Sequence, residues 1–261
     1  TWQQQGLQFL WSKGKKEKIM QKRLDLILYE KGFFKTKEKA KEAVLSGIVF
    51  YGDKNLTKPG AKFDEDVNLT IKGEKLKYVS RAGLKLEKAK DFFNLNFNEK
   101  VVLDAGASTG GFTDFCLQNG AKLVYSVDVG HNQLDNSLQN NPKVKNLEGT
   151  DIRKIERQNF LPLDFIVSDL SFISLTKVLD KFYELLPTKG SLVCLIKPQF
   201  ECGKEIAQKT KGIIKNEKLQ QNICKNIINF AKNIGFCFIG LTDSPILGTA
   251  GNKEFLAYFK K

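Results

Sequence analysis

Histidine and paired cysteine are scarce in this chain of 261 residues. Its single histidine, His131, excludes most zinc sites and every scheme in which a serine or cysteine pairs with histidine, unless His131 itself takes part. The five cysteines form no CxxC pair, and three of them stand in apolar runs. We therefore expect buried thiols in a reducing cytoplasm and predict no metal site.

Long apolar runs are also missing. No stretch approaches the roughly 18 apolar residues that a membrane-spanning helix needs, so no membrane segment is predicted. The N-terminus lacks the order of a signal peptide, because its apolar residues are scattered and its charges follow them. We expect residues 1–20 to be a poorly ordered extension.

Positive charge, in contrast, is abundant. Lys and Arg number 42 against 29 Asp and Glu, which gives a net charge of +13 and a pI near 9.4. Such a balance favours a polyanionic partner, with nucleic acid as the first candidate. The many lysines and few arginines also fit a plain compositional bias toward Lys and Asn codons. With 41% apolar residues, the chain can bury one ordinary core and a small second one.

Residues 21–72 read as a small α+β domain. Leu24, Ile27 and Leu28 have helical spacing, and Thr36 is placed to cap a second helix that Gly47 ends. Short alternating stretches and turns follow, among them "KPG" at 58–60. We predict two helices and a few strands here, and then a linker over 73–80.

Residues 81–261 alternate between strand and helix patterns. The strand patterns include "VVLDAG", "LVYSVDVG", "DFIVSDLS", "SLVCLIKPQ" and, at the end, "EFLAYFK". This alternation predicts an α/β fold, a mainly parallel Rossmann-like sheet with helices on both faces. Ligands of such sheets bind beyond the carboxyl ends of the strands.

A glycine-rich turn follows the first of these strands. Asp104 and Gly106 precede Gly110 and Gly111, and this spacing differs from the G-x-G-x-x-G of dinucleotide folds. Asp128 ends the next strand, where an acid can bind both ribose hydroxyls of an adenosine. Asp104 suits the ammonium of a methionine moiety, so S-adenosylmethionine is the preferred cofactor, while an NAD-type reductase stays possible.

Two further residues belong to the predicted cofactor site. Ser108 lies inside the glycine-rich turn, and Asp151 follows the third strand. Asp151 stands where methyltransferases often place a carboxylate on the adenine amino group. A helix N-cap is an equally good interpretation of Asp151.

Four charged residues are predicted to meet at the carboxyl edge of the sheet. Asp169 and Lys197 each end a strand, and a lysine after "LVCLI" is costly to bury without a carboxylate beside it. Glu254 begins the last strand, and Lys85 lies on the helix ahead of the first. Each residue alone is better explained as a cap or a solvated charge; together they indicate a catalytic cluster.

The N-terminal pattern resembles the RNA-binding domain named after the fourth small-subunit ribosomal protein. "RLDLIL", "TKEKAKEAVLSGIV" and "KPG" carry this resemblance over residues 21–72. Thr36-Lys37 replaces the usual Ser-Arg, and Phe50-Tyr51-Gly52 replaces a Val-Asn-Gly turn. The candidate RNA contacts are Arg23, Lys37, Lys41 and Arg81.

From about residue 21 to its end, including the order of the two domains, the chain resembles the TlyA (haemolysin A) family of ribosomal RNA methyltransferases. "YVSRAGLKLEKA", "SDLSFISLTKVL", "LIKPQFE" and "GNKEFLAYF" carry this resemblance. Lys85, Asp169, Lys197 and Glu254 match the tetrad of the related FtsJ-type ribose 2′-O-methyltransferases. The resemblance implies methyl transfer from S-adenosylmethionine to cytidine in 16S or 23S ribosomal RNA, with ribosomal subunits as partners and Lys197 as the general base. A membrane-active haemolysin and an inactive RNA-binding protein with this fold are the alternatives.

Overall fold

The chain is seen in a computed structural model that describes residues 21–72 and 77–261. The described residues form two compact units that divide near residue 74, and each unit has a hydrophobic core of its own. The expected extension over residues 1–20 and positions 73–76 of the expected linker lie outside the described residues.

The second unit begins earlier than the predicted linker allows. Tyr78 and Ser80 are each only 4% exposed, and Tyr78 belongs to the core that holds Leu86 and Phe115. The backbone N–H of Val79 also donates to the Asp114 carboxylate at 2.8 Å. Residues 78–80 are therefore part of the second unit, since they are packed and hydrogen-bonded like the rest of it.

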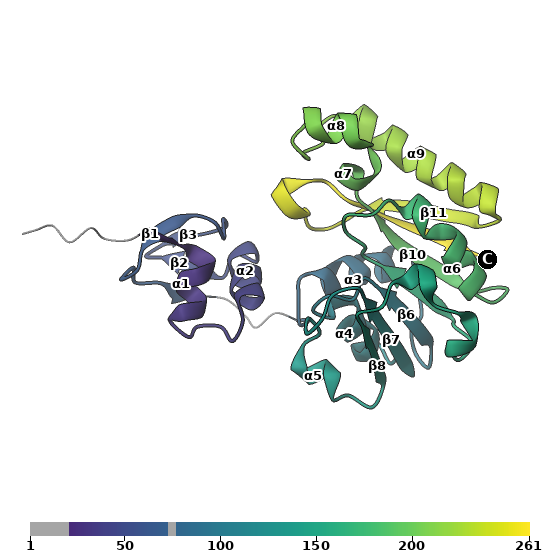
Figure 1. Cartoon of the computed structure of the whole chain (residues 1–261), viewed down its shortest axis with the longest axis horizontal. Coiled ribbons are helices and arrows are strands. Elements are labelled where there is room, and N and C mark those ends of the chain that lie inside the picture. Colours follow the sequence, from purple (N-terminus) through teal and green to yellow (C-terminus); the bar gives the residue numbers. More distant parts are fainter. Residues whose placement is uncertain (1–20, 73–76) are drawn as a thin grey trace, which may run out of the picture. The chain divides into compact units, whose positions relative to one another are not determined.

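The N-terminal unit is the expected α+β arrangement (Figure 1). Its elements are β1 (Gln21–Arg23), α1 (Leu24–Glu30), α2 (Lys37–Leu45), β2 (Val49–Tyr51), β3 (Lys54–Asn55), β4 (Lys62–Asp64) and β5 (Thr70–Ile71). β1 pairs with β4, and a three-stranded sheet has the order β3-β2-β5. Leu24, Leu28 and Val44 are fully buried in the core. Thr36 caps α2 as expected, because its Oγ1 accepts from the Lys39 N–H at 3.1 Å.

A seven-stranded sheet forms the centre of the second unit, with the order β11-β12-β10-β9-β6-β7-β8. Its strands are β6 (Val101–Ala105), β7 (Leu123–Asp128), β8 (Val144–Glu148), β9 (Phe165–Ser168), β10 (Ser191–Ile196), β11 (Cys237–Asp243) and β12 (Phe255–Lys260). Strands β6 to β10 are parallel to one another, and β12 runs antiparallel to β10 and β11. The predicted α/β fold is confirmed.

Helices cover both faces of this sheet (Figure 1). They are α3 (Ala82–Phe93), α4 (Gly111–Gln118), α5 (Asn136–Gln139), α6 (Leu179–Leu185), α7 (Pro198–Glu201), α8 (Lys204–Lys209) and α9 (Glu217–Ile234), with four short 3₁₀ helices, η1 (Ile152–Lys154), η2 (Arg157–Asn159), η3 (Leu175–Lys177) and η4 (Thr249–Gly251).

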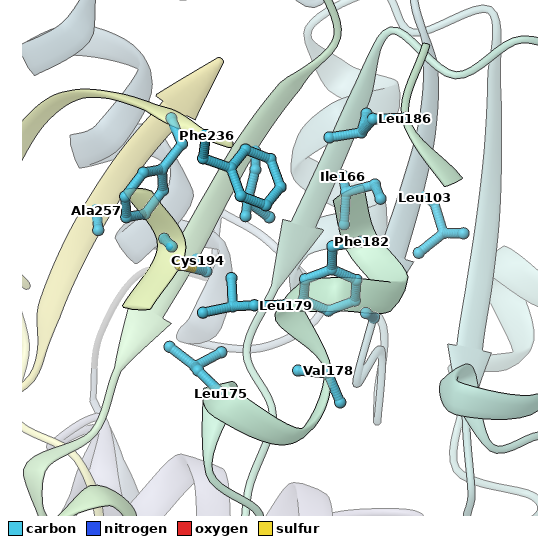
Figure 2. Close-up of a cluster of buried hydrophobic side chains, with 14 of the residues drawn as sticks. Leu103, Ile166, Leu175, Val178, Leu179, Phe182, Leu186, Cys194, Phe236 and Ala257 are labelled. Carbon is cyan, nitrogen blue, oxygen red and sulfur yellow. The ribbon is translucent and has the colours of Figure 1, made fainter. Parts of the chain in front are cut away.

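Alternation along each strand divides the core between the two faces. Val102 packs on the face covered by α3 and α4, whereas Leu103 packs on the face covered by α6 and α9. Figure 2 shows the second of these cores, in which Leu179 and Phe182 of α6 lie against Ile166 of β9. The sheet is thereby buried on both faces, so a ligand can reach it only at the ends of its strands.

The strand order reverses beside β6. The chain runs outward from β6 through β7 to β8 and then returns to place β9 on the other side of β6. Ligands of open α/β sheets bind at this kind of reversal, outside the carboxyl ends of the strands. The carboxyl ends of β6, β7, β9 and β10 are therefore where a functional site is expected.

Candidate active site

The four charged residues predicted to act together do meet at this edge of the sheet. Asp169 directly follows β9, Lys197 directly follows β10, and Glu254 directly precedes β12. Because β12 is antiparallel to β10, with Phe255 paired to Ile196, its beginning lies beside the end of β10. Lys85 reaches the same place from the first turns of α3.

These side chains form one chain of alternating charge. Lys197 Nζ lies 2.6 Å from Asp169 Oδ1, and the other carboxylate oxygen of Asp169 lies 3.1 Å from Lys85 Nζ. Lys85 Nζ continues to Glu254 Oε2 at 2.8 Å. We call this series, Lys197–Asp169–Lys85–Glu254, the ionic chain. It carries two positive and two negative charges, so it is neutral as a whole.

Burial makes these contacts strong. Lys85 and Lys197 are each 7% exposed, and Glu254 is 2% exposed. Burial by itself would raise the pKa of Asp169, but Lys85 and Lys197 outweigh it and hold that pKa at about 2. Burial likewise opposes the charged form of Lys85, yet Asp169 and Glu254 raise its pKa above the ordinary lysine value. Lys85 and Asp169 are thus both charged at neutral pH.

Two neutral side chains that were not predicted as site residues lie at the ends of the ionic chain. Lys197 Nζ donates to Ser171 Oγ at 2.7 Å, and Gln199 Nε2 donates to Glu254 Oε1 at 3.4 Å. Ser171 stands two positions after Asp169, and Gln199 stands two positions after Lys197. This closeness to members of the ionic chain was the only signal in the sequence that either residue belongs to the site. Ser174, in the same loop as Ser171, caps the 3₁₀ helix η3 by accepting from the Thr176 N–H at 3.2 Å.

A pocket of about 350 Å³ lies beside the ionic chain. It extends over the ends of β6, β7 and β9 and is lined by Gly106, Ser108, Val127, Asp128, Val129, Gln133, Thr150, Ile152, Asp169, Leu170, Ser171 and Phe172. Phe172 is 90% exposed, and its ring lies 5.1 Å from that of Phe200. The pocket therefore joins the predicted cofactor loop to Asp169, the one member of the ionic chain that lines it.

The glycine-rich turn closes one side of this pocket. Gly106 has a φ of +86°, and a Cβ there would come within 3.2 Å of the Asp169 carbonyl oxygen. Side chains at Gly110 and Gly111 would instead collide with Leu138 and with Ser80. Gly106 is therefore needed for a close approach at the pocket, while Gly110 and Gly111 are needed to pack the turn against its neighbours.

The Asp128 carboxylate binds backbone N–H groups of this turn and of the loop after β7. Its two carboxylate oxygens accept from the N–H groups of Ser108 at 2.9 Å and Gly130 at 2.8 Å. Each oxygen keeps a further lone pair, so Asp128 can still accept from two hydroxyls of a ligand in the pocket. Glu148, which the sequence did not single out, accepts from the N–H groups of Gln133 and Leu134 and shapes the loop after β7.

Asp104 is fully buried beneath the turn. Burial raises its pKa to about 7, although Thr113 Oγ1 donates to its Oδ2 at 2.7 Å. Its other oxygen, Oδ1, has no hydrogen-bond partner within residues 21–72 and 77–261. A buried carboxylate with an unused oxygen fits a ligand ammonium.

Asp151 adopts the N-cap role that was the alternative for it. Its carboxylate accepts from the Arg153 N–H at 3.0 Å and lies 2.6 Å from Arg153 Nη2 in an ion pair. The hydrogen bonds from Arg153 hold the pKa of Asp151 at about 2. Its neighbours Thr150 and Ile152 line the pocket, whereas Asp151 is not among the lining residues.

The predicted RNA contacts divide between the two units. In the first unit, Arg23 forms an ion pair with Asp25 at 2.6 Å, Lys37 Nζ lies 5.8 Å from the centre of the Tyr29 ring, and Lys41 is exposed. Arg81 is half-buried at the N-cap position of α3 in the second unit.

The part of the chain that the structure describes holds no cluster of three or more His, Cys, Asp or Glu residues that could bind a metal ion. In that same part, every helix is too short or too polar to cross a membrane.

The fold and the site define a methyltransferase-type α/β unit with an ionic chain at the carboxyl edge of its sheet. Residues 78–261 match the family described as FtsJ-like methyltransferase. Because the match covers most of the chain, the chain belongs to this family.

Named relatives agree with this assignment. The chain is 45% identical over 239 residues to the "Putative rRNA methyltransferase YqxC" of Bacillus subtilis, covering 90% of this chain and 84% of that protein. It is 33% identical over 240 residues to the "16S/23S rRNA (cytidine-2'-O)-methyltransferase TlyA" of Mycobacterium tuberculosis, covering 91% and 89%. A solved structure, "Putative hemolysin from Streptococcus thermophilus", has a TM-score of 0.73 and 44% identity and covers 93% and 89%. The resemblance to the TlyA family is confirmed.

Proposed function

We propose that this protein transfers a methyl group from S-adenosylmethionine to a ribose 2′-hydroxyl of ribosomal RNA. The observation that carries the proposal is the ionic chain, because it holds two buried lysines around Asp169, which lines the pocket at the strand ends. A ribose hydroxyl is a weak nucleophile until a base takes its proton, and a buried lysine can serve as that base.

Lys197 is the better candidate for the base. Lys85 lies between two carboxylates, at 3.1 Å from Asp169 and 2.8 Å from Glu254, and these contacts favour its charged form. Lys197 has one carboxylate and one neutral hydroxyl as partners, so fewer negative charges hold its proton. Lys85 then acts as a fixed positive charge that keeps Asp169 ionised and correctly oriented.

The residues around the pocket fit S-adenosylmethionine. Asp104 would take the ammonium group, Asp128 the ribose hydroxyls, and the turn from Gly106 to Gly111, with Ser108, would enclose the nucleoside. Asp151 keeps the adenine amino group as its proposed partner, which would require it to share its carboxylate with Arg153. When bound, this cofactor supplies an electrophilic methyl group.

Ribosomal RNA is the proposed substrate, and cytidine the proposed nucleotide. The Mycobacterium tuberculosis relative is named for cytidine 2′-O-methylation of 16S and 23S RNA, and this chain carries a net charge of +13. Arg23, Lys37, Lys41 and Arg81 are the proposed phosphate contacts, since basic side chains provide most of the affinity for RNA.

The proposal is tested by incubating the purified protein with small and large ribosomal subunits and labelled S-adenosylmethionine. We expect label in a ribose of the RNA, and we expect Lys197→Ala to lower the rate about 10²–10⁴-fold. Lys100→Ala is a matched control, because Lys100 pairs with Asp164 at the opposite edge of the sheet, 3.0 Å away. No transfer to either subunit by the wild type would refute the function, and full activity in Lys197→Ala would refute the base.

A further inference from the structure

Lys197 Nζ has three oxygen partners, as many as an ammonium has hydrogens. They are Asp169 Oδ1, an ion-pair contact at 2.6 Å, and two hydrogen-bond acceptors, Ser171 Oγ at 2.7 Å and, more weakly, the Asp169 carbonyl oxygen at 3.4 Å. Two of these come from Asp169 itself. The orientation of the lysine nitrogen therefore depends on Asp169 and on Ser171.

Ser171 is the partner on the open side of Lys197. Its side chain is exposed and lines the pocket beside Asp169. Among residues 21–72 and 77–261, the only hydrogen bond that its hydroxyl makes is the one with Lys197. Ser174, three residues later, caps η3 and also bonds to Glu201. The two serines of the same loop thus have separate tasks, and Ser171 has no capping role.

The backbone on the N-terminal side of Ser171 is held against the turn after β6. Before Ser171, the Asp169 N–H donates to the Ala105 carbonyl at 3.2 Å, and Gly106 allows the Asp169 carbonyl to lie close to the β6 turn. After it, Phe172 turns the chain with a φ of +64°. The hydroxyl of Ser171 therefore reaches Lys197 from a defined position.

We infer that Ser171 is a positioning residue, whose hydroxyl aims the Lys197 amine at the ribose 2′-hydroxyl. The inference rests on the proposed function. A neutral lysine amine has two hydrogens and one lone pair, and it is useful as a base only if the lone pair points at the substrate. With Ser171 Oγ accepting one hydrogen and the Asp169 carboxylate beside the other, the lone pair takes the third direction, where the Asp169 carbonyl oxygen is only a weak partner at 3.4 Å and the ribose hydroxyl would replace it. The proton then passes from O2′ to Nζ, and the electron pair of the broken O–H bond stays on O2′.

The hydroxyl of Ser171 suits this role better than a carboxylate would. A second carboxylate at this position would give Lys197 the same surroundings as Lys85 and favour its charged form. A hydroxyl can accept from the ammonium before the reaction and from the neutral amine during it without adding charge.

The inference is tested with Ser171→Ala, Ser171→Thr and the matched control Ser174→Ala, using S-adenosylmethionine and the ribosomal subunit that the wild type methylates. We expect Ser171→Ala to lower kcat about 10–100-fold, as for other misaligned groups, while KM for both substrates changes less than about threefold. Ser171→Thr, which keeps the hydroxyl, should recover most of the lost kcat. Ser174→Ala should lower Tm by weakening a cap but leave kcat within about threefold of wild type.

Three results would overturn the inference: a wild-type kcat in Ser171→Ala, an effect confined to KM, or no recovery in Ser171→Thr. A wild type that transfers no methyl group to either subunit refutes the proposed function and this inference with it. A wild type that works, beside an unaffected Ser171→Ala, refutes the inference alone.

Discussion

At the scale of single residues, the ionic chain offsets the free-energy cost of burying two lysines only while all four of its residues are present. Lys85 and Lys197 share Asp169, one on each carboxylate oxygen. A buried ion pair adds little net stability over an apolar replacement, but removal of one partner leaves an uncompensated charge. Asp169 is the critical link, because its loss affects both lysines at once.

We expect Asp169→Asn to lower the free energy of unfolding by about 3–5 kcal/mol at pH 7, measured by urea denaturation. Glu205→Gln is the control, since its pair with Lys209 is 81% and 73% exposed and is worth less than about 0.5 kcal/mol. A loss no larger than that of the control would show that the ionic chain is not a stabilising unit.

The same comparison has a predictable pH dependence. Burial opposes ionisation of Asp169, but Lys85 and Lys197 lower its pKa in the folded protein from 3.8 to about 2. An acidic group whose pKa is lower in the folded protein stabilises the fold at any pH above its pKa in the unfolded chain. This stabilisation is lost as the pH falls through its pKa in the folded protein. The difference between wild type and Asp169→Asn should therefore narrow between about pH 4 and pH 2.

Asp104 should couple cofactor binding to pH. Burial raises the pKa of Asp104 to about 7. The ammonium group of a bound S-adenosylmethionine would favour the ionised carboxylate. Binding of the cofactor should therefore release a proton from each protein molecule in which Asp104 is still neutral. We expect the affinity for S-adenosylmethionine to rise about tenfold per pH unit between about pH 5.5 and 6.5 and to level off above 7. Calorimetry in two buffers of different ionisation enthalpy measures the released proton directly.

Asp104→Asn provides the control for this coupling. The amide keeps the shape of the side chain and cannot ionise. Binding should be weaker than in wild type at pH 7.5 and nearly independent of pH below it. A pH dependence that persists in Asp104→Asn would assign the coupling to another group.

At the scale of elements, the glycine-rich turn between β6 and α4, which forms the predicted cofactor loop, packs against the loop after β9. Gly106 lies at the contact, with a φ of +86° and the Asp169 carbonyl 3.2 Å from where a Cβ would be. Gly212 has a similar φ, +73°, but nothing lies within 4 Å of its Cβ position. Comparing substitutions at Gly106 and Gly212 therefore separates the free-energy cost of a left-handed backbone from the cost of disturbing the close approach to Asp169.

We expect Gly212→Ala to cost about 1 kcal/mol of stability, through its backbone conformation alone, and to leave methyl transfer unchanged. Gly106→Ala should cost more and should weaken S-adenosylmethionine binding by at least about tenfold, because Asp169 and the turn must move apart. Thermal unfolding and cofactor titration of both variants measure this. Equal effects of the two substitutions would mean that the close approach has no function.

The elements were more predictable from sequence than the site. The alternation of apolar strands with helices predicted the sheet, and the antiparallel last strand brought Glu254 to the right edge. Ser171 and Gln199 were not predicted as site residues, since a neutral side chain, unlike the buried charge of Lys197, does not demand a partner that the sequence could suggest. Local periodicity carries no information on such contacts.

Short-range pairings were also missed. The Arg23 guanidinium and the Asp151 carboxylate each have a partner only two positions away, Asp25 and Arg153. The sequence showed these neighbours, but the choice between a partner on the same loop and a ligand depends on backbone geometry. Composition and spacing do not determine that geometry.

At the scale of the whole molecule, the two units have separate cores, so we expect that the proposed affinities for RNA and for S-adenosylmethionine can be altered independently. The helix α2 of the first unit begins at Lys37, and Lys41 is exposed on it. Lys22 in the same unit is held by Glu30 at 2.9 Å and Glu65 at 3.0 Å. Lys37 and Lys41 are therefore better placed than Lys22 to contact phosphates.

We expect the double variant Lys37→Ala, Lys41→Ala to weaken binding to the ribosomal subunit and to flatten the plot of log affinity against log salt concentration. Each lost phosphate contact should reduce the slope by about 0.7–0.9, so the double variant should lose about 1.5. S-adenosylmethionine affinity and kcat at saturating subunit should stay at wild-type values, because the second unit is unchanged. Lys22→Ala is the control, and its slope should match that of wild type. An unchanged slope in the double variant would show that α2 does not contact the RNA backbone.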